Sequence, residues 1–139
     1  MNTSPWTALD PDIEGLLDEY DRRSTEPGTG ATALFAASFL ALDPVHAVTL
    51  TPAMLAAVLP ARREMFDAAG VGAIRRARAC QLRLDETHAL VNVNWTAERA
   101  GQQPLQLDST FLVRRESAGL RIVVYLNHHD VSALLSAGA

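Results

Sequence analysis

The chain has 139 residues, of which 48% are hydrophobic and 20% are charged. This composition excludes an intrinsically disordered chain, and the length suits a single domain, residues 1–139, with its own hydrophobic core. Eight glycines and seven prolines without a period exclude a collagen-like repeat, and the lone Cys80 excludes a disulfide scaffold.

The formal net charge is −4, and all 12 basic residues are arginines, spread from Arg22 to Arg121. Nucleic acid is not an expected partner, because neutralising phosphates requires a dense basic face. The absence of lysine excludes Schiff-base enzymes and the lysine-containing phosphate loop.

No membrane partner is expected either. Residues 1–6 lack the basic and apolar regions of an export signal, and the longest nearly apolar stretch, residues 31–42, is too short to cross a bilayer. With one thiol and no export signal, a reducing cytoplasm is the expected location.

The first half of the chain predicts helices and short strands. Asp10 and Pro11 are typical of an N-cap followed by the first helical residue, and a stripe of apolar residues three and four apart continues to Tyr20. Thr51 and Pro52 repeat this start for a second helix. The remaining expected elements are a turn at 27–30, a helical turn at 31–37, strands at 38–42 and 46–50, a break or kink at Pro60, and a helical turn at 61–69 ended by glycines.

From residue 73 onward the period of the apolar residues becomes two. Four alternating runs, residues 73–84, 88–96, 105–115 and 120–128, predict an antiparallel meander. Helices followed by such a sheet indicate an α+β fold. In the last run apolar residues occupy both faces, so we expect a second copy of the chain to cover the outer face of the sheet in a homodimer.

Segments 13–20, 34–36, 39–45 and 119–124, together with the middle helix, resemble the nuclear transport factor 2-like superfamily, which includes ketosteroid isomerases and SnoaL-like polyketide cyclases. The resemblance covers residues 10–130. It implies a cone-shaped curved antiparallel sheet wrapped around the N-terminal helices, an apolar pocket inside, no cofactor, and dimerisation over the outer sheet face.

The resemblance also implies two catalytic groups. Tyr20 matches the tyrosine that stabilises an oxyanion in ketosteroid isomerases, and Asp43 matches the carboxylate that moves the proton next to a carbonyl. The second oxyanion donor of that family falls at Phe111, so the pair is incomplete and steroid isomerisation is not expected. The alternatives are a packed aromatic at Tyr20 and a turn former at Asp43.

The pair His128 and His129 is followed by Asp130. Adjacent strand residues point to opposite faces, so the two imidazoles cannot chelate one metal ion, and no metal site is expected. His128 is expected on the outer face. His129 is expected on the pocket side as an acid or base, or else as a solvated strand end.

The pocket wall is predicted from the strand period. One of Arg76 and Arg78 could enter the cavity, although a solvated strand end is the alternative. The expected ligand-binding residues are Trp95, Phe111, Val113, Val123, Tyr125 and Asn127.

The sequence therefore predicts a protein that binds a small, largely apolar molecule and acts as an isomerase, cyclase or dehydratase. The alternatives are a ligand-binding module without catalysis and a purely associative domain.

Overall fold

The computed structural model describes residues 4–26, 28 and 30–137 of the chain. The elements follow in the order α1 (Pro11–Thr25), the 3-10 helix η1 (Gly30–Leu34), β1 (Phe35–Leu42), β2 (Ala47–Leu50), α2 (Pro52–Ala68), β3 (Val71–Arg83), β4 (His88–Arg99), β5 (Leu105–Glu116), β6 (Gly119–Asn127) and α3 (Val131–Ala137).

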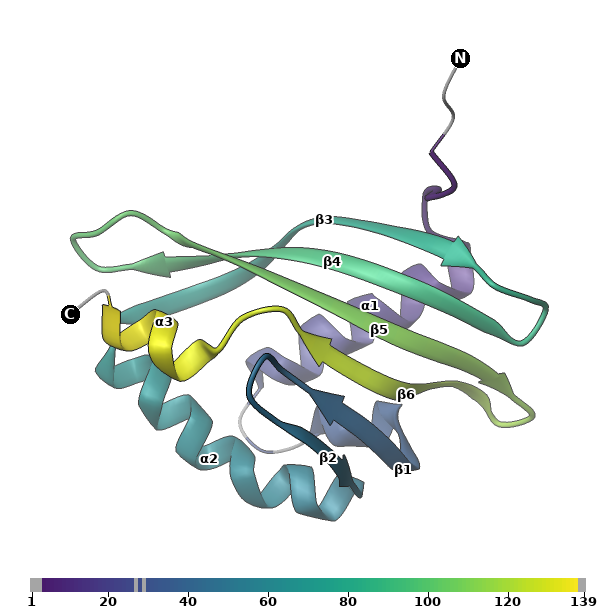
Figure 1. Cartoon of the computed structure of the whole chain (residues 1–139), viewed down its shortest axis with the longest axis horizontal. Coiled ribbons are helices and arrows are strands. Elements are labelled where there is room, and N and C mark those ends of the chain that lie inside the picture. The colour runs from purple at the N-terminus through teal and green to yellow at the C-terminus, as the bar shows by residue number, and fades with distance from the viewer. Residues whose placement is uncertain (1–3, 27, 29, 138–139) are drawn as a thin grey trace.

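All six strands form one curved sheet in the order β2-β1-β6-β5-β4-β3, with α1 behind it and α2 along its lower side (Figure 1). The expected α+β class is confirmed. The sheet is mixed, however, because β1 runs parallel to β6 while the other neighbouring pairs are antiparallel. The expectation of a wholly antiparallel sheet was therefore wrong at this one pair.

Helix α1 begins at Pro11, as predicted, but its N-terminus is held differently. The side chain of Asp10 makes no capping hydrogen bond. Instead its carboxylate pairs with Arg115 of β5 at 3.3 Å, and its backbone N–H donates to the side chain of Gln81 on β3. These bonds tie the start of the helix to the sheet. Of the predicted turn at 27–30, Pro27 and Thr29 lie outside the described residues.

Helix α2 is capped as expected, since the hydroxyl of Thr51 accepts a hydrogen bond from the N–H of Met54. Of the break or kink predicted at Pro60, the break was wrong, because one helix runs through this residue from Pro52 to Ala68. The prediction of a helical turn over residues 31–37 was also too long, since β1 already begins at Phe35.

The core lies between the inner face of the sheet and α1. In β4 and β5 the odd-numbered residues from Ala89 to Ala97 and from Leu105 to Val113 are buried, while their even-numbered neighbours are more exposed. Ile13 and Leu17 of α1 pack against them with no exposed surface. The inner face therefore carries the residues that could form an internal site.

Two of the register shifts in the sheet change which residues reach that inner face. In β3 the register shifts between Arg76, opposite Trp95, and Arg78, opposite Asn94. In β6 the register places Val113 opposite Ile122 and Leu112 opposite Val124, so Val123 is the extra residue. Strict alternation fails at both points.

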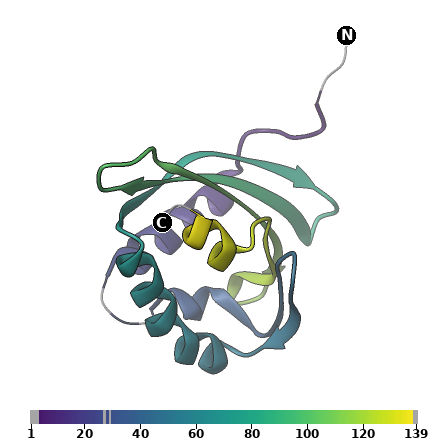
Figure 2. The ribbon, with the colours of Figure 1, turned by 60° about the vertical axis from the view of Figure 1, so that its left-hand side comes forward.

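Helix α3 was not predicted. Asp130 precedes it and accepts a hydrogen bond from the N–H of Ala133, which is the usual contact of an N-cap. Its Leu135 is buried in the core, and Ser132 contacts the sulfur of Met65 on α2. Figure 2 shows α3 across the end of the molecule that α1, α2 and the sheet surround. The helix therefore covers the open end of the cone.

None of the helices within the described residues is long and apolar enough to cross a membrane.

Candidate functional site

An aromatic cluster occupies the inner face of the sheet. The ring of Tyr20 on α1 lies 5.9 Å from that of Trp95 on β4 and 5.6 Å from that of Phe111 on β5, measured between centroids. Phe111 in turn lies 5.3 Å from Tyr125 on β6, and Phe35 of β1 lies 6.3 Å from Tyr125. Four strands and α1 thus bring their rings into mutual contact, which is the usual spacing of packed aromatic pairs.

Three polar side chains meet at one end of this cluster. The guanidinium Nη2 of Arg62 on α2 lies 3.5 Å from the hydroxyl of Tyr125. Tyr20 and Ser109 of β5 also lie close enough to Tyr125 to act on its phenol. A guanidinium and two phenols from three different elements therefore converge on an otherwise apolar wall.

The surroundings shift the pKa values of the Tyr20 and Tyr125 phenols in opposite directions. Burial raises the pKa of Tyr20 well above its ordinary value of 10.0, and the nearby Tyr125 adds to this. Burial also acts on Tyr125, but the charge of Arg62 and the hydrogen bonds from Arg62 and Ser109 outweigh it and lower the pKa of that phenol. Tyr20 is therefore suited to donate a proton in a hydrogen bond, and Tyr125 tolerates negative charge at its oxygen.

Asp43 lies in the turn between β1 and β2. Its Oδ1 accepts hydrogen bonds from the backbone N–H groups of Val45 and His46, at 2.8 and 2.7 Å. Burial acts to raise the pKa of this carboxyl, but the backbone hydrogen bonds and His46 hold it below its ordinary value. A carboxylate with a lowered pKa is a weaker base, so these contacts favour the turn-forming alternative for Asp43.

His129 lies just beyond the end of β6, outside the strand period from which its pocket-side position was predicted. Its Nε2 lies 3.6 Å from Oδ2 of Asp108, a residue whose partner in the sheet, Asn94, belongs to the outer face. His128 takes the expected outward position, with its Nε2 2.7 Å from the hydroxyl of Thr110. Among the described residues no group of three or more His, Cys, Asp or Glu side chains is placed to hold a metal ion.

Most of the predicted pocket-wall residues lie on the inner face. Trp95, Phe111, Val113 and Asn127 are buried there, and Tyr125 belongs to the aromatic cluster. Val123 does not join them, because the bulge in β6 gives its inner position to Ile122, which is fully buried.

Arg76 and Arg78, two of the four arginines of β3, are separated by the register shift between them. Arg76 faces inward and pairs with Asp18 and Asp21 of α1, at 2.5 and 3.2 Å, so it is a structural cation between sheet and helix. Arg78 lies opposite Asn94 on the outer face. The arginine that does reach the aromatic cluster, Arg62, was missed. A helix period alone could have placed it on the same side of α2 as Leu55, Leu59 and Phe66.

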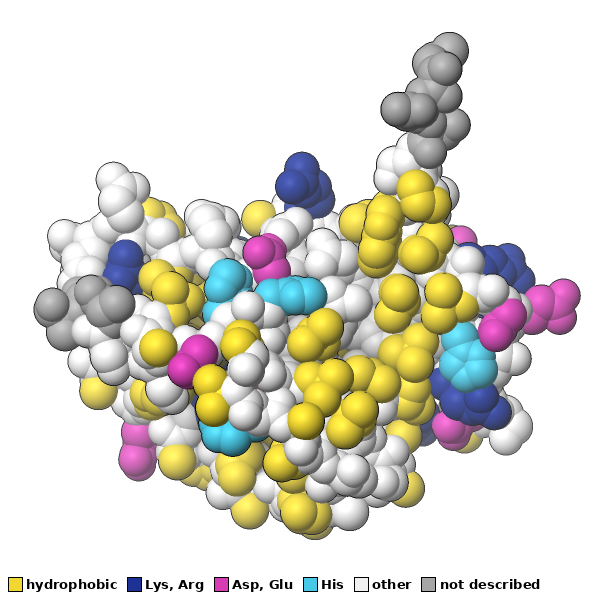
Figure 3. Space-filling view, viewed as in Figure 1, with side chains coloured by type: hydrophobic (Ala, Val, Ile, Leu, Met, Phe, Trp, Pro, Cys, Tyr) yellow, Lys and Arg dark blue, Asp and Glu magenta, His cyan; other side chains and the backbone are white. Residues whose placement is uncertain are grey.

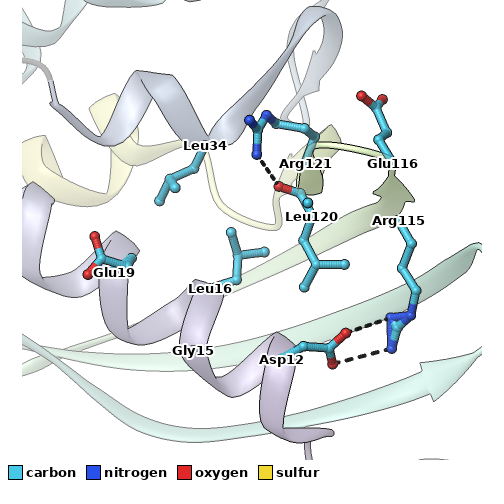
Figure 4. Close-up of a pocket in the computed structure, with 10 residues that line it drawn as sticks. Asp12, Gly15, Leu16, Glu19, Leu34, Arg115, Glu116, Leu120 and Arg121 are labelled. Carbon is cyan, nitrogen blue, oxygen red and sulfur yellow. Dashed lines mark hydrogen bonds and ion pairs between the residues drawn. The ribbon is translucent and has the colours of Figure 1, made fainter.

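Two of the hollows on the surface of the described structure lie away from the aromatic cluster, since no ring of that cluster lines them. The larger, of about 500 Å³, lies between α1 and the β5–β6 hairpin (Figure 4). Leu16, Leu34 and Leu120 line it, and Arg115 pairs with Asp12 at 3.1 Å on one side. The smaller, of about 340 Å³, is lined by residues of β3 and of the segment that precedes α1.

The outer face of the sheet carries an unbroken apolar row, which we call the outer row. The register places Leu90 opposite Leu112, Leu112 opposite Val124, and Val124 opposite Leu40. Leu82 of β3 extends the row at the other edge. Figure 3 shows hydrophobic side chains gathered in a band across this face. The band contrasts with the Asn92 and Thr110 pair in the neighbouring row.

No protein-family model and no curated protein matches the sequence. The fold, in contrast, recurs in solved structures. A nuclear transport factor 2-like protein from Pseudomonas putida has a TM-score of 0.62 at 16% identity, with 84% of this chain and 82% of that chain covered. A protein with a cystatin-like fold from Nostoc punctiforme has a TM-score of 0.65 at 12% identity, covering 91% and 97%.

The chain has the nuclear transport factor 2-like fold. A protein with a ketosteroid isomerase-like fold from Catenulispora acidiphila, solved in complex with trimethylamine, is a further neighbour of this fold, with a TM-score of 0.56 at 16% identity, covering 92% of both chains. At these identities the nuclear transport factor 2-like likeness describes the backbone, so function has to be argued from the side chains.

Proposed function

We propose that the protein binds a small, largely apolar molecule at the inner face of its sheet, where Tyr20, Tyr125 and Arg62 converge. The convergence of these three polar groups on an aromatic wall is the observation that carries the proposal. Binding sites for small molecules are mostly apolar, with a few polar groups that fix orientation, and this cluster has that character.

The ligand is expected at the Arg62 end of the cluster. The remaining rings already touch one another, with centroids 4.5 Å apart for Phe35 and Phe39. Met65 lies one turn further along α2 than Arg62 and contacts Ser132 of α3. A ligand would therefore enter beside α3 and stack against the rings without separating all of them.

Binding can be followed at Trp95 with the planar, uncharged probe 2-naphthol. The chain has two tryptophans, so the Trp6→Phe variant leaves Trp95 as the only indole N–H signal in the NMR spectrum. We expect 2-naphthol to shift this signal. Tyr20→Phe and Tyr125→Phe should each weaken binding about three- to tenfold, the range for one lost hydrogen bond.

The matched control is Thr110→Val, which removes a hydroxyl from the outer face of β5 and should leave the affinity unchanged. An unmoved Trp95 signal at saturating 2-naphthol would contradict the proposal.

Proton transfer next to a carbonyl is the second candidate, and the pair of partly buried phenols favours it. A phenol donor at Tyr20 would stabilise an enolate oxygen, while a base removes the proton from carbon. Asp43 is the proposed base, although its turn contacts weigh against it. In deuterated water the enzyme hypothesis predicts exchange of the C1 protons of 2-tetralone, lost in Asp43→Asn. If that variant exchanges as fast as the parent, Asp43 is not the base.

We also propose that a second copy of the chain covers the outer row, giving a homodimer. A contiguous apolar band across five strands is typical of an interaction surface. A second copy of the chain is the simplest partner for this surface. The outer row spans the sheet from Leu82 to Leu40, so the rows of two copies can pack against each other across a two-fold axis.

A further inference from the structure

Arg62 differs in its partners from half of the twelve arginines of the described chain. Many of them lie within 4.0 Å of a carboxylate: Arg22, Arg23, Arg75, Arg76, Arg114 and Arg115. Arg62 makes no such ion pair among the described residues. Its contacts are with neutral groups, the hydroxyl of Tyr125 at 3.5 Å and the ring of Phe66, 5.7 Å from its Cζ.

Neutral partners leave most of a guanidinium's binding capacity unused. The group has five N–H donors in a planar fork that matches a carboxylate, and charge-assisted pairs are about twice as strong as neutral hydrogen bonds. A ring face and one phenol oxygen hold the cation in place but do not neutralise it. The site therefore presents a positive charge to whatever lies beside Tyr125.

The nearest negative group does not use this charge. The field of Asp43 reaches Arg62, but the Oδ1 oxygen of Asp43 is taken by the N–H groups of Val45 and His46. The apolar rings around Arg62 lower the local dielectric, which strengthens any interaction with an anion that displaces water there.

We infer that the molecule bound at this site carries a carboxylate on an aromatic or otherwise apolar body, and that Arg62 recognises the carboxylate. The inference rests on the proposed function, since it specifies the ligand of the same site. The apolar body stacks on Phe111 and Trp95, and the phenol of Tyr20 donates to the second carboxylate oxygen. Arg62 is thus the residue that determines specificity.

Isothermal titration calorimetry with 2-naphthoate and 2-naphthol tests the inference, because the two probes share a ring system and differ in charge. We expect 2-naphthoate to bind about tenfold tighter or more to the parent protein, the factor expected for a charge-assisted pair. Arg62→Met keeps the stem against Phe66 and should abolish this preference, while Arg62→Lys should retain part of it.

The matched control is Arg63→Met on the same helix. Arg63 is exposed and donates to the backbone oxygen of Ser24, so its loss changes the net charge equally without touching the site. A second control, Arg121→Gln, tests the surface hollow beside Leu120 as an alternative anion site.

The outcomes separate the two proposals. If neither probe binds, the proposed function fails and the inference fails with it. If both probes bind equally and Arg62→Met changes neither affinity, the protein binds apolar molecules but the inference is overturned. If Arg121→Gln weakens 2-naphthoate and Arg62→Met does not, the anion site is the surface hollow, which also overturns it.

Asp43→Asn gives an independent check with the opposite sign. Because Asp43 places a negative charge within reach of Arg62, its removal should strengthen the binding of 2-naphthoate. Weaker binding of 2-naphthoate in this variant would contradict the electrostatic argument.

Discussion

Nε of Arg76 on β3 lies 3.2 Å from Oδ2 of Asp21 on α1. The pair is incompletely satisfied, because Oδ1 of Asp21 and Nη1 of Arg76 are buried without a hydrogen-bond partner among the described residues. Burial raises the pKa of Asp21 above its ordinary value of 3.8, and the neighbouring Asp18 adds to this, although Arg76 acts in the opposite direction. On balance, the ionised form of Asp21 therefore lowers the stability of the folded state, despite its ion pair.

We predict that Asp21→Asn raises the stability of the protein at neutral pH. A carboxyl whose pKa is raised in the folded state binds its proton more tightly there than in the unfolded chain. Its contribution to stability is present below pH 3.8 and is lost as the pH rises through the folded-state pKa. When urea unfolding is measured between pH 3.5 and 7, the free energy of unfolding should decrease less with rising pH for Asp21→Asn than for the parent.

The control for this prediction is Asp18→Asn, which removes the other partner of Arg76. Because Asp18 is exposed and pairs with Arg76 at 2.5 Å, its loss should destabilise the fold or leave it unchanged. A destabilised Asp21→Asn protein at pH 7 would show that the ion pair outweighs the burial of the charge.

The sequence predicted the fold class and the four long strands closely, because a period of two persists through β3 to β6 and apolar residues mark one face. It misplaced Val123 because the bulge in β6 adds one residue to the strand, and strict alternation does not report that. It predicted a break or kink at Pro60, and the structure has one helix, Pro52–Ala68, that contains this proline.

The site was predicted less well than the fold. Tyr20 and Tyr125 are placed by local periods, so their meeting inside the sheet follows once the fold is known. Arg62 joins them from a helix that no strand register fixes, and only the helix period distinguishes it from Arg63. Asp43 was predicted from the sequence, but the structure gives it a different environment. The family resemblance suggested a catalytic base, whereas its carboxylate accepts a hydrogen bond from the backbone of its own turn.

The outer row gives a prediction about assembly. Leu112 lies at its centre, between Leu90 and Val124, so Leu112→Asp places a charge in the proposed interface. We expect the parent protein to sediment as a dimer at micromolar concentration and Leu112→Asp as a monomer. Gln106→Asp, on the same strand and face but outside the row, is the control and should remain dimeric. A monomeric parent would contradict the proposed dimer.

Two glycines should respond to alanine with opposite signs. A Cβ on Gly15, within α1, meets no atom within 4 Å, so Gly15→Ala should stabilise the protein by about 0.5–1 kcal/mol through helix propensity. Gly119, at the β5–β6 hairpin, has φ = 122°, where an alanine is strained. Gly119→Ala should therefore destabilise by about 1 kcal/mol or more. Chemical denaturation of both variants measures the difference.

The packing of α3 decides whether the open end of the cone is closed in solution. Leu135 is 7% exposed and belongs to the core cluster, so Leu135→Ala should lower the free energy of unfolding by about 2–4 kcal/mol if α3 packs as described. Ser136→Ala removes only an exposed hydroxyl bonded to the backbone of Ser132 and should cost little. Equal stabilities for the two variants would mean that α3 contributes no core packing. In that case the aromatic cluster would be open to solvent at the Arg62 end, and ligand entry would require no displacement of the helix.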